Sequence, residues 1–517
     1  MAIMFATLPP LIAALLVQRC FPHPAERIEL VETHASWLLL AGEFAYKIKK
    51  PITLPFLDYG TLAQREACCR AELELNRRLA PDLYLDVVPI GGSLQQPRPG
   101  TTPAIEWAVR MRRFDENDLL DRLAARGELL PAHLTQLAAT LCAFQESAAA
   151  AAPDTRFGAP QQVLAAAQEN FVELRQLLPA TAQAEVEQLA RWTDEEFTRR
   201  APDFAARKAA DRVREGHGDL HLGNLVLIDG TVTPFDCIEF NEDFRWNDVI
   251  SEIAFVWIDL LDHRRPGLAA WLLNAWLEIS GDFHALAVLR FYAVYRAVVR
   301  AKVAALRAGQ ENAAQRQAEF DSSRAYLQLA LQIAATCPHS GIPVALSAPP
   351  LTLVITCGLS GSGKTTASSA LLLDANTAAA GNVIRLRSDV ERKRLFGLAP
   401  LAGSGSALDG SIYTAEATTR TYARLLDLAH DLLAAGWPVI VDAAFLRRSE
   451  RTDFSRLAAQ LRVDFAILAT EAPADELRRR IGARRADASE ATVAVLEKQL
   501  NWFEPLDADE RACTIRA

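Results

Sequence analysis

The stretch Gly358-Leu359-Ser360-Gly361-Ser362-Gly363-Lys364-Thr365 decides how the last third of this 517-residue chain folds. It matches the pattern G-x-x-x-x-G-K-[ST], in which backbone N–H groups of the loop and of a helix N-terminus wrap the phosphates of a nucleotide. The apolar run 351–357 before it predicts a buried strand, and the residues after it predict a helix. With further strands predicted at 383–386, 439–441 and 465–469, strands alternate with helices, which indicates a parallel α/β sheet.

The residues of this loop are expected to bind ATP and its Mg²⁺ ion. Lys364 would contact the β- and γ-phosphates, and the Thr365 hydroxyl would ligate Mg²⁺. Asp442 ends an apolar strand and is expected to be a metal-binding carboxylate, with a plain helix N-cap as the alternative. The predicted nucleotide-binding set is Gly358, Ser360, Gly361, Ser362, Gly363, Lys364, Thr365 and Thr366.

A further carboxylate, Asp389, follows the predicted strand 383–386. An acid at the carboxyl end of a strand beside the phosphate loop lies where an acceptor hydroxyl would meet the γ-phosphate. Asp389 is therefore the predicted general base. Arg392, one turn into the next helix, would hold an anionic group of the acceptor.

A second signature, His217-Gly218-Asp219-Leu220-His221-Leu222-Gly223-Asn224, has the spacing of a protein-kinase-type catalytic loop. Asp219 would accept or orient the proton of an acceptor hydroxyl. Asn224 and Asp236 would hold Mg²⁺ from two loops that are joined by a hairpin over 225–235. In the structural alternative, Asp219 caps its own loop; we assign His217 to loop support.

Residues 28–33, 36–41 and 44–50 predict three strands of a small N-terminal sheet, followed by a helix over 61–79. Lys47 on the third strand would contact the α- and β-phosphates and pair with Glu72 on that helix. Lys49 lies on the same strand face, because side chains alternate along a strand, and it remains the alternative phosphate lysine.

On His217–Asn224 and on Pro234-Phe235-Asp236-Cys237-Ile238-Glu239, residues 1 to about 335 resemble the aminoglycoside phosphotransferase and choline kinase-like family. The resemblance implies a bilobal protein-kinase-like fold and ATP-dependent phosphorylation of a small-molecule hydroxyl. Two features depart from the protein-kinase pattern. There is no G-x-G-x-x-G loop before Lys47, and the second motif reads Asp-Cys-Ile in place of Asp-Phe-Gly.

Residues 351–517 resemble the zeta-toxin-like and polynucleotide-kinase-like P-loop kinases, and more loosely gluconate and shikimate kinases. Asp389 and Arg392 match the acceptor-site Asp and Arg of the polynucleotide kinases. In such kinases a lid helix places arginines over the transferring phosphoryl group, which implies this role for Arg484, with Arg480 as the alternative. The order of the two parts is similar to a bacterial two-domain family described as aminoglycoside phosphotransferase plus AAA family ATP-binding protein.

The predicted organisation is a kinase-like domain over 1–336, a proline-rich linker over 337–350 and a P-loop kinase domain over 351–517. The expected function is a tandem kinase with a small-molecule hydroxyl acceptor. The alternatives are a polynucleotide 5′-hydroxyl kinase with a regulatory N-terminal domain, and a P-loop switch that controls the N-terminal enzyme.

Charge and composition bear on the partners of the chain. The net charge is −9, and residues 351–517 carry 21 basic and 21 acidic side chains, so a long nucleic-acid footprint is disfavoured. The eight cysteines show no C-x-x-C spacing, which favours reduced thiols and a cytoplasmic location. The apolar stretch 1–17 is too short for a bilayer span and predicts a packed helix, with a signal peptide as the alternative.

Overall fold

The computed structural model describes residues 8–17, 20–54, 57–309, 313–339, 351–374, 381–400, 402, 412, 414–483 and 491–516. Its packing divides into two compact units. The first comprises Met1–Leu129, Ala143–Gly158 and Lys208–Glu252, and the second comprises Leu130–Cys142, Ala159–Arg207 and Ile253–Ala517. The predicted linker lies outside the described residues from 340 to 350, and the predicted domain boundaries stay predictions.

The first unit contains a six-stranded antiparallel sheet in the order β1-β2-β3-β8-β6-β7. Its strands are β1 (Ile28–Glu32), β2 (Ser36–Ala41), β3 (Phe44–Lys49), β6 (Tyr84–Gly92), β7 (Pro97–Pro99) and β8 (Glu106–Arg112). The three strands predicted before residue 50 are confirmed to within one residue at each end.

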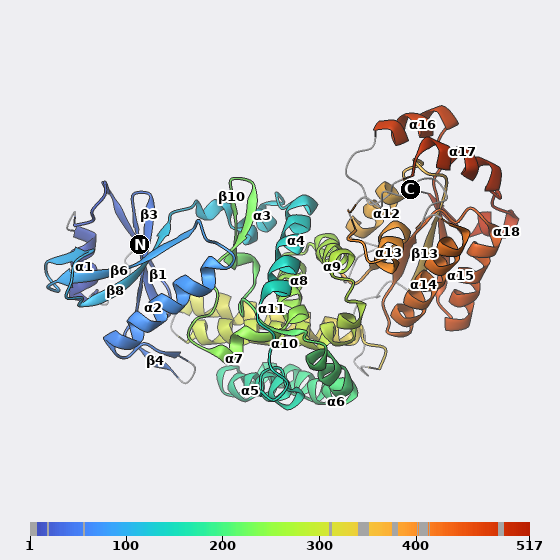
Figure 1. Cartoon of the computed structure of the whole chain (residues 1–517). Coiled ribbons are helices and arrows are strands. Elements are labelled where there is room, and N and C mark those ends of the chain that lie inside the picture. Colours follow the sequence, from blue (N-terminus) through green and yellow to red (C-terminus); the bar gives the residue numbers. More distant parts are fainter. Residues whose placement is uncertain are drawn as a thin grey trace. The chain divides into compact units, whose positions relative to one another are not determined.

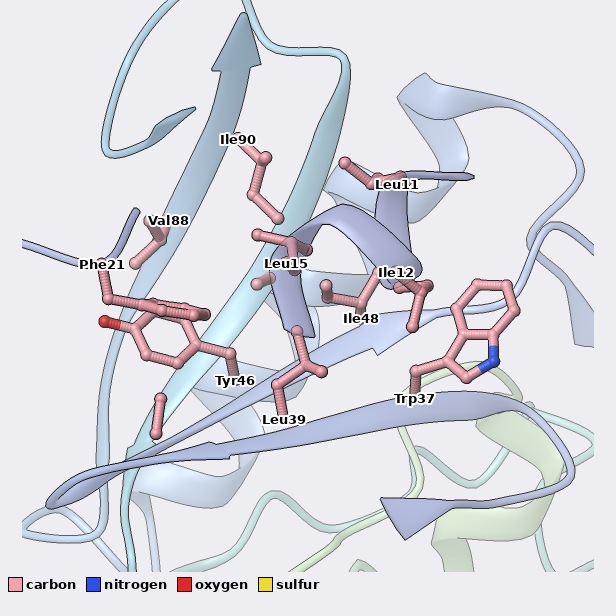
Figure 2. Packing of buried hydrophobic residues seen from close by; sticks show 12 residues of the cluster. Leu11, Ile12, Leu15, Phe21, Trp37, Leu39, Tyr46, Ile48, Val88 and Ile90 are labelled. Carbon is pink, nitrogen blue, oxygen red and sulfur yellow. The ribbon is translucent and has the colours of Figure 1, made fainter. Parts of the chain in front are cut away.

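Helix α1 (Pro10–Val17) covers one face of this sheet. Figure 2 shows Leu11, Ile12 and Leu15 of α1 against Leu39 and Ile48 of the sheet, and all five side chains are buried. Pro10 is the first residue of the helix, a position at which its missing N–H group costs no hydrogen bond. The expectation of a packed N-terminal helix is thus confirmed for the described part of this segment.

Helix α2 (Leu62–Arg77) covers the other face of the sheet. It begins after Thr61, which forms a reciprocal capping box with Gln64. Cys69 of α2 lies in one buried cluster with Ala45 of β3. Because strand side chains alternate, Lys47 and Lys49 share the face of Ala45 and point toward α2.

The catalytic-loop sequence lies between short strands of the same unit. Strand β9 (Val213–Glu215) pairs with β12 (Trp246–Asp248), and a one-turn helix, η3 (Leu222–Asn224), leads into the hairpin of β10 (Leu225–Ile228) and β11 (Thr231–Pro234). The predicted hairpin is confirmed. It joins the two loops that carry Asn224 and Asp236.

The second unit begins with helices and ends with the P-loop sheet. Its helices before residue 340 include α5 (Pro160–Leu177), α9 (Pro266–Ser280), α10 (Leu286–Ala308) and α11 (Ala313–Ala335), while α4 (Pro131–Ser147), α6 (Gln183–Ala209) and α8 (Val249–Asp262) contribute residues to both units. Within the described residues, no helix combines the length and the apolarity needed to span a bilayer.

The P-loop sheet is parallel and has the order β14-β15-β13-β16-β17. Its strands are β13 (Thr352–Cys357), β14 (Ile384–Arg387), β15 (Val439–Asp442), β16 (Asp464–Ala469) and β17 (Thr514–Arg516). Helices α12 (Lys364–Leu373), α13 (Ser388–Leu395), α14 (Ala415–Ala434) and α15 (Arg448–Leu461) pack against it (Figure 1). The predicted α/β class is confirmed, and the edge strand β17 is an element that the sequence pattern missed.

Candidate functional site

Three of the predicted residues of the first site meet at one point of the first unit. The Lys47 Nζ atom lies 2.8 Å from Glu72 Oε1 and 2.5 Å from Asp236 Oδ1. Asp236 keeps 43% of its side chain exposed, whereas Glu72 is fully buried. Lys47 therefore joins a buried carboxylate on α2 to a solvent-facing carboxylate that follows the hairpin.

Lys49 lies deeper on the same face and also pairs with Glu72. Its Nζ atom is 2.7 Å from Glu72 Oε2, donates to the Tyr59 hydroxyl at 3.2 Å and forms an ion pair with Glu239. Burial raises the pKa of Glu72, but the two lysines outweigh it and hold this pKa well below its usual range. Glu72 is thus a carboxylate shared by both lysines, and Lys47 is the one that reaches Asp236.

The catalytic-loop residues Asp219 and Asn224 are also in contact. The Asn224 side-chain amide donates to the backbone carbonyl of Asp219 at 2.9 Å and to its Oδ2 atom at 3.2 Å. His217 is buried, and its Nε2 atom donates to the Phe235 carbonyl at 2.8 Å while Nδ1 accepts from the Asp219 N–H group at 3.3 Å. Burial lowers the pKa of His217, which keeps it neutral in this bridging position, and its contacts are those of loop support.

Backbone geometry at this site is specialised. Asp236 has a φ of 62°, a left-handed conformation that few non-glycine residues adopt and that clusters at functional sites. Its N–H group donates to the Tyr84 hydroxyl at 3.1 Å. At Gly218, with a φ of 89°, a Cβ atom would lie 2.8 Å from the Phe244 carbonyl oxygen, so the loop requires glycine there.

Sequence reasoning missed three residues that hold this site together. The Glu252 carboxylate is buried and accepts the N–H groups of His217 and Gly218. Tyr59 and Glu239 hold Lys49. Glu239 belongs to the quoted second motif, so its position was a usable signal, whereas Glu252 and Tyr59 carry no motif.

The phosphate loop of the second unit has the expected strand–loop–helix setting. Lys364 begins α12, and its Nζ atom donates to the Gly358 and Leu359 carbonyls at 2.9 and 2.8 Å. Ser362 shares a hydrogen bond of 2.7 Å with the Thr470 hydroxyl, and the Ser360 N–H group donates to Gln499 at 2.8 Å. These contacts tie the loop to the segments after β16.

Asp442 is the buried last residue of β15. The single hydroxyl of Ser368 on α12 lies within hydrogen-bond distance of two acceptors, Asp442 Oδ2 at 3.2 Å and the Thr365 carbonyl at 3.1 Å. The alternative of a helix N-cap is wrong, because α15 begins at Arg448 after its N-cap Arg447. Asp442 thus contacts the first turn of α12 through Ser368, and that turn also carries Thr365, the other predicted metal ligand of this site.

Asp389 and Arg392 line the same cleft as Lys364, Thr365, Thr366 and Asp442. Arg392 is buried and donates to the Ile412 carbonyl at 3.0 Å and to Thr418 Oγ1 at 3.2 Å. The cleft has a volume of about 2260 Å³. Since one small ligand typically occupies roughly 300–1,000 Å³, this space is large enough for a nucleotide and a second substrate.

The lid arginines differ in what the structure describes. Helix α16 (Ala474–Ala483) packs beside the phosphate loop, with Leu477 and Ile481 in one cluster with Leu359. Arg480 on this helix lines the cleft and donates to the Gly361 carbonyl at 3.4 Å. Arg484 lies outside the described residues.

Both sites have the donor chemistry that Mg²⁺ and ATP require. Mg²⁺ prefers hard oxygen ligands and is usually held by one or two carboxylates together with substrate phosphates. Asn224 and Asp236 supply such oxygens in the first unit, and Thr365 and Asp442 supply them in the second. Lys47 and Lys364 are the cations placed beside them.

Two family matches agree with this geometry. Residues 63–292 match the phosphotransferase enzyme family, and residues 353–506 match an AAA domain family. Uncharacterized proteins of Mycobacterium bovis and Mycobacterium tuberculosis, the latter including Rv2004c, are 30% identical over 491 residues, covering 93% of this chain and 93% of theirs.

Solved structures with low sequence identity also match. A choline kinase from Cryptosporidium parvum Iowa II has a TM-score of 0.38 at 11% identity, with 63% of this chain and 94% of that chain covered. An aminoglycoside 2′-phosphotransferase-IIIa has a TM-score of 0.38 at 15% identity, with 62% and 98% covered. A sugar kinase from Janibacter sp. HTCC2649 has a TM-score of 0.24 at 22% identity, with 33% and 85% covered.

The phosphotransferase match identifies the chain as an ATP-dependent kinase that acts on hydroxyl groups. Identity to the mycobacterial proteins extends through both matched regions. The chain therefore belongs to the same bacterial two-domain family as these proteins, in which a phosphotransferase-type region is followed by a P-loop AAA domain.

Proposed function

We propose that the chain is a tandem kinase, in which each of the two sites transfers the γ-phosphate of Mg-ATP to a hydroxyl group. The acceptor of the first site would be a small molecule of aminoglycoside- or sugar-like character. The observation that carries the proposal is that each unit contains its own set of phosphate-binding lysine and metal-binding oxygens. A P-loop switch would also need the second set, but it would not need Asp389, the proposed base, which lines the same cleft as Lys364.

In the first site, Lys47 would neutralise the α- and β-phosphates while Glu72 holds its ammonium group in place. Asn224 and Asp236 would hold Mg²⁺, which neutralises the charge that develops on the transferring phosphoryl group. Asp219 would orient the acceptor hydroxyl and take its proton. Its backbone and side chain are fixed by Asn224, so the base and the metal ligand are positioned together.

In the second site, Lys364 and the loop N–H groups would bind the β- and γ-phosphates. Thr365 and Asp442 would hold the metal ion, and Asp389 would act on the acceptor hydroxyl. Arg392 would bind an anionic group of the acceptor. Arg484, or Arg480 beside the phosphate loop, would compensate charge on the transferring phosphoryl group.

Single-site variants test this assignment on the full chain. Labelled ATP is offered with pools of aminoglycosides, sugars, nucleosides and 5′-hydroxyl oligonucleotides to the variants Asp219→Ala and Lys364→Ala. We expect each variant to lose transfer to a different acceptor pool, while the control variants Asp82→Ala and Lys302→Ala retain both. The proposal fails if both variants lose the same transfer, or if calorimetry finds fewer than two Mg-nucleotide equivalents per chain.

A further inference from the structure

Helix α9 is built into the core of the P-loop sheet, although it precedes that sheet by about seventy residues in the chain. Ala270 of α9 lies in one buried cluster with Val354 of β13, Ala367 of α12 and Ile440 of β15. Gly267 lies so close to the Leu373 backbone that a Cβ atom would be 2.4 Å from its carbonyl oxygen. Helix α9 therefore packs directly on α12, the helix that begins with Lys364 of the phosphate-loop motif.

Helix α9 also pairs with the edge strand β14. The Asn274 amide group donates to the Val383 carbonyl at 2.7 Å, and its carbonyl oxygen accepts the Arg385 N–H group at 2.6 Å. One side chain thus satisfies two backbone groups at an edge of the sheet that α9 covers, where unpaired groups would otherwise invite misassembly. The register of α9 along β14 is fixed by these two bonds.

Glu278, one turn beyond Asn274, binds the two arginines of β14. Its Oε1 atom lies 2.7 Å from Arg385, and its Oε2 atom lies 3.2 Å from Arg387. Arg385 reaches on to the Ser369 hydroxyl at 2.7 Å and the Ser368 hydroxyl at 3.4 Å. The carboxylate on α9 is thereby connected to the helix that begins with Lys364.

Arg387 links the same carboxylate to the metal-binding end of the site. Its Nε atom lies 4.0 Å from Asp442 Oδ2, so Arg387 stands between two carboxylates, Glu278 and Asp442. Both are within ion-pair range, and both the arginine and Asp442 are largely buried. An opposite charge in a buried setting acts strongly on its neighbour.

The C-terminal end of α9 is held by a further residue, Arg394, which is not part of the Glu278 ion pairs. Arg394 of α13 donates to the Glu278 carbonyl at 2.7 Å and to the Leu277 carbonyl at 3.3 Å, which satisfies two of the last carbonyls of the helix. Gly281 follows in a left-handed conformation with a φ of 66°, and a Cβ atom there would lie 2.5 Å from Arg394 Nε. The backbone that carries Glu278 is therefore fixed to the P-loop region on both sides of β14.

We propose that Glu278 is a positioning residue of the P-loop site, which keeps Arg387 from approaching Asp442 more closely than 4.0 Å and so leaves Asp442 available to Mg²⁺. The inference rests on the proposed metal role of Asp442. Without the negative charge on Glu278, Arg385 and Arg387 would turn to Asp442, the other carboxylate beside them. The arginines would then compete with the metal ion for the same oxygen atoms.

The inference assigns the P-loop site a component from the phosphotransferase-family region, because α9 lies within the matched residues 63–292. Metal-dependent nucleotide binding by the second site would thus depend on a side chain that the matched AAA region, residues 353–506, does not contain. Residues from both matched regions would thus be needed for the function of this one site.

The test measures binding of fluorescent mant-ADP to the full chain, once with Mg²⁺ and once with EDTA. Every protein carries Asp236→Ala to remove the metal carboxylate of the first site, and Lys364→Ala in this background gives the blank. We expect Glu278→Gln to reduce the Mg²⁺-dependent gain in affinity about tenfold, about 1.4 kcal/mol. Binding in EDTA should be unchanged or tighter, because a negative charge that lines the cleft has been removed.

The control variants separate positioning from general damage. Glu169→Gln removes an exposed carboxylate of α5 outside the cleft and should change neither affinity. Glu278→Gln combined with Arg387→Gln restores the local charge balance and should recover most of the Mg²⁺-dependent gain. The inference is overturned if Glu278→Gln weakens binding equally with and without Mg²⁺, or leaves the gain intact.

Asp442→Asn distinguishes the inference from the proposed function on which it rests. If Asp442→Asn keeps the full Mg²⁺-dependent gain, the metal role of Asp442 is wrong and the inference falls with it. If Asp442→Asn removes the gain while Glu278→Gln does not, the metal role stands and only the role of Glu278 is refuted.

Discussion

Replacing Lys49 with methionine should destabilise the first unit far more than an ordinary lysine substitution. Lys49 is 1% exposed, and its ammonium group lies between the buried carboxylates of Glu72 and Glu239. It also lies over the Tyr59 ring, 4.7 Å from the ring centre. Lys49→Met keeps an unbranched side chain that is one atom shorter, and it leaves Glu239 buried without this cation.

The expected magnitude follows from the burial of the partners. Breaking a buried ion pair by removing one partner typically costs about 3–5 kcal/mol, because the remaining charge is left uncompensated. A domain is usually stable by only about 5–15 kcal/mol. Lys49→Met should therefore remove roughly a fifth or more of the stability of this unit. Glu72 keeps Lys47 as a partner, so most of the cost should arise at Glu239.

Native-state hydrogen exchange of the full chain at low urea concentrations measures this effect unit by unit. Peptides from β3 and α2 should lose about 3–5 kcal/mol of protection, while peptides from the P-loop sheet should keep theirs. The neighbouring variant Lys50→Met is a matched control, because Lys50 pairs with the half-exposed Glu32. Such surface pairs contribute about 0–1 kcal/mol.

A double variant tests the cause. Lys49→Met combined with Glu239→Gln removes both charges, so it should be more stable than Lys49→Met alone. The reasoning is refuted if Lys49→Met lies within about 1 kcal/mol of the unchanged protein, or if the double variant is less stable than Lys49→Met.

Three further predictions concern acid stability and the two proposed bases. The pKa of Glu72 is lowered from 4.5 to about 2 in the folded protein, so its ionised form stabilises the fold above pH 4.5 and this contribution is lost as the pH falls toward 2. The urea midpoints of peptides from the first unit, measured by hydrogen exchange between pH 5 and 3, should therefore fall less steeply in Glu72→Gln than in the unchanged protein. An equal slope in the two proteins would contradict this. Asp219→Ala should lower the turnover of the first site at least about 10²-fold while calorimetry finds Mg-ADP binding within about twofold, and retained turnover would exclude its role as base. Asp389→Asn should abolish transfer by the second site and preserve Mg-ADP binding there, so full transfer by this variant in the labelled-ATP assay would refute the general-base assignment.

The sequence predicted those parts of the sites that depend on local patterns. The strand, loop and helix around Gly358–Thr365 follow from an apolar run, a glycine-rich loop and a helical segment that are adjacent in the chain. The hairpin between Asn224 and Asp236 is equally local. Strand β17 was missed because its three residues, Thr514–Arg516, carry too short a pattern and form a strand only through pairing with β16.

The contacts of Glu278 and Glu252 depend on long-range packing, which no motif encodes. Glu278 lies on a helix whose sequence gives no sign that it packs on a strand more than one hundred residues later. Glu252 likewise has the ordinary appearance of an acid in the first turn of a helix. Periodicity placed Lys47 and Lys49 on one face of β3, but their depths in the unit are set by the packing of α2 and Glu239.

The two sites share one electrostatic arrangement despite their unrelated folds. In each, two basic residues stand two positions apart on one strand, Lys47 with Lys49 on β3 and Arg385 with Arg387 on β14, and one glutamate from a helix binds both. Side chains two positions apart share a strand face, so burying that face brings two positive charges together. Each additional buried cation requires a compensating carboxylate, since an uncompensated buried charge is strongly destabilising. A pair of basic residues at this spacing in a predicted buried strand therefore predicts a glutamate or aspartate from a packed helix. In both sites the less buried cation of the pair, Lys47 or Arg387, is the one within ion-pair range of the carboxylate that is proposed to hold the metal ion.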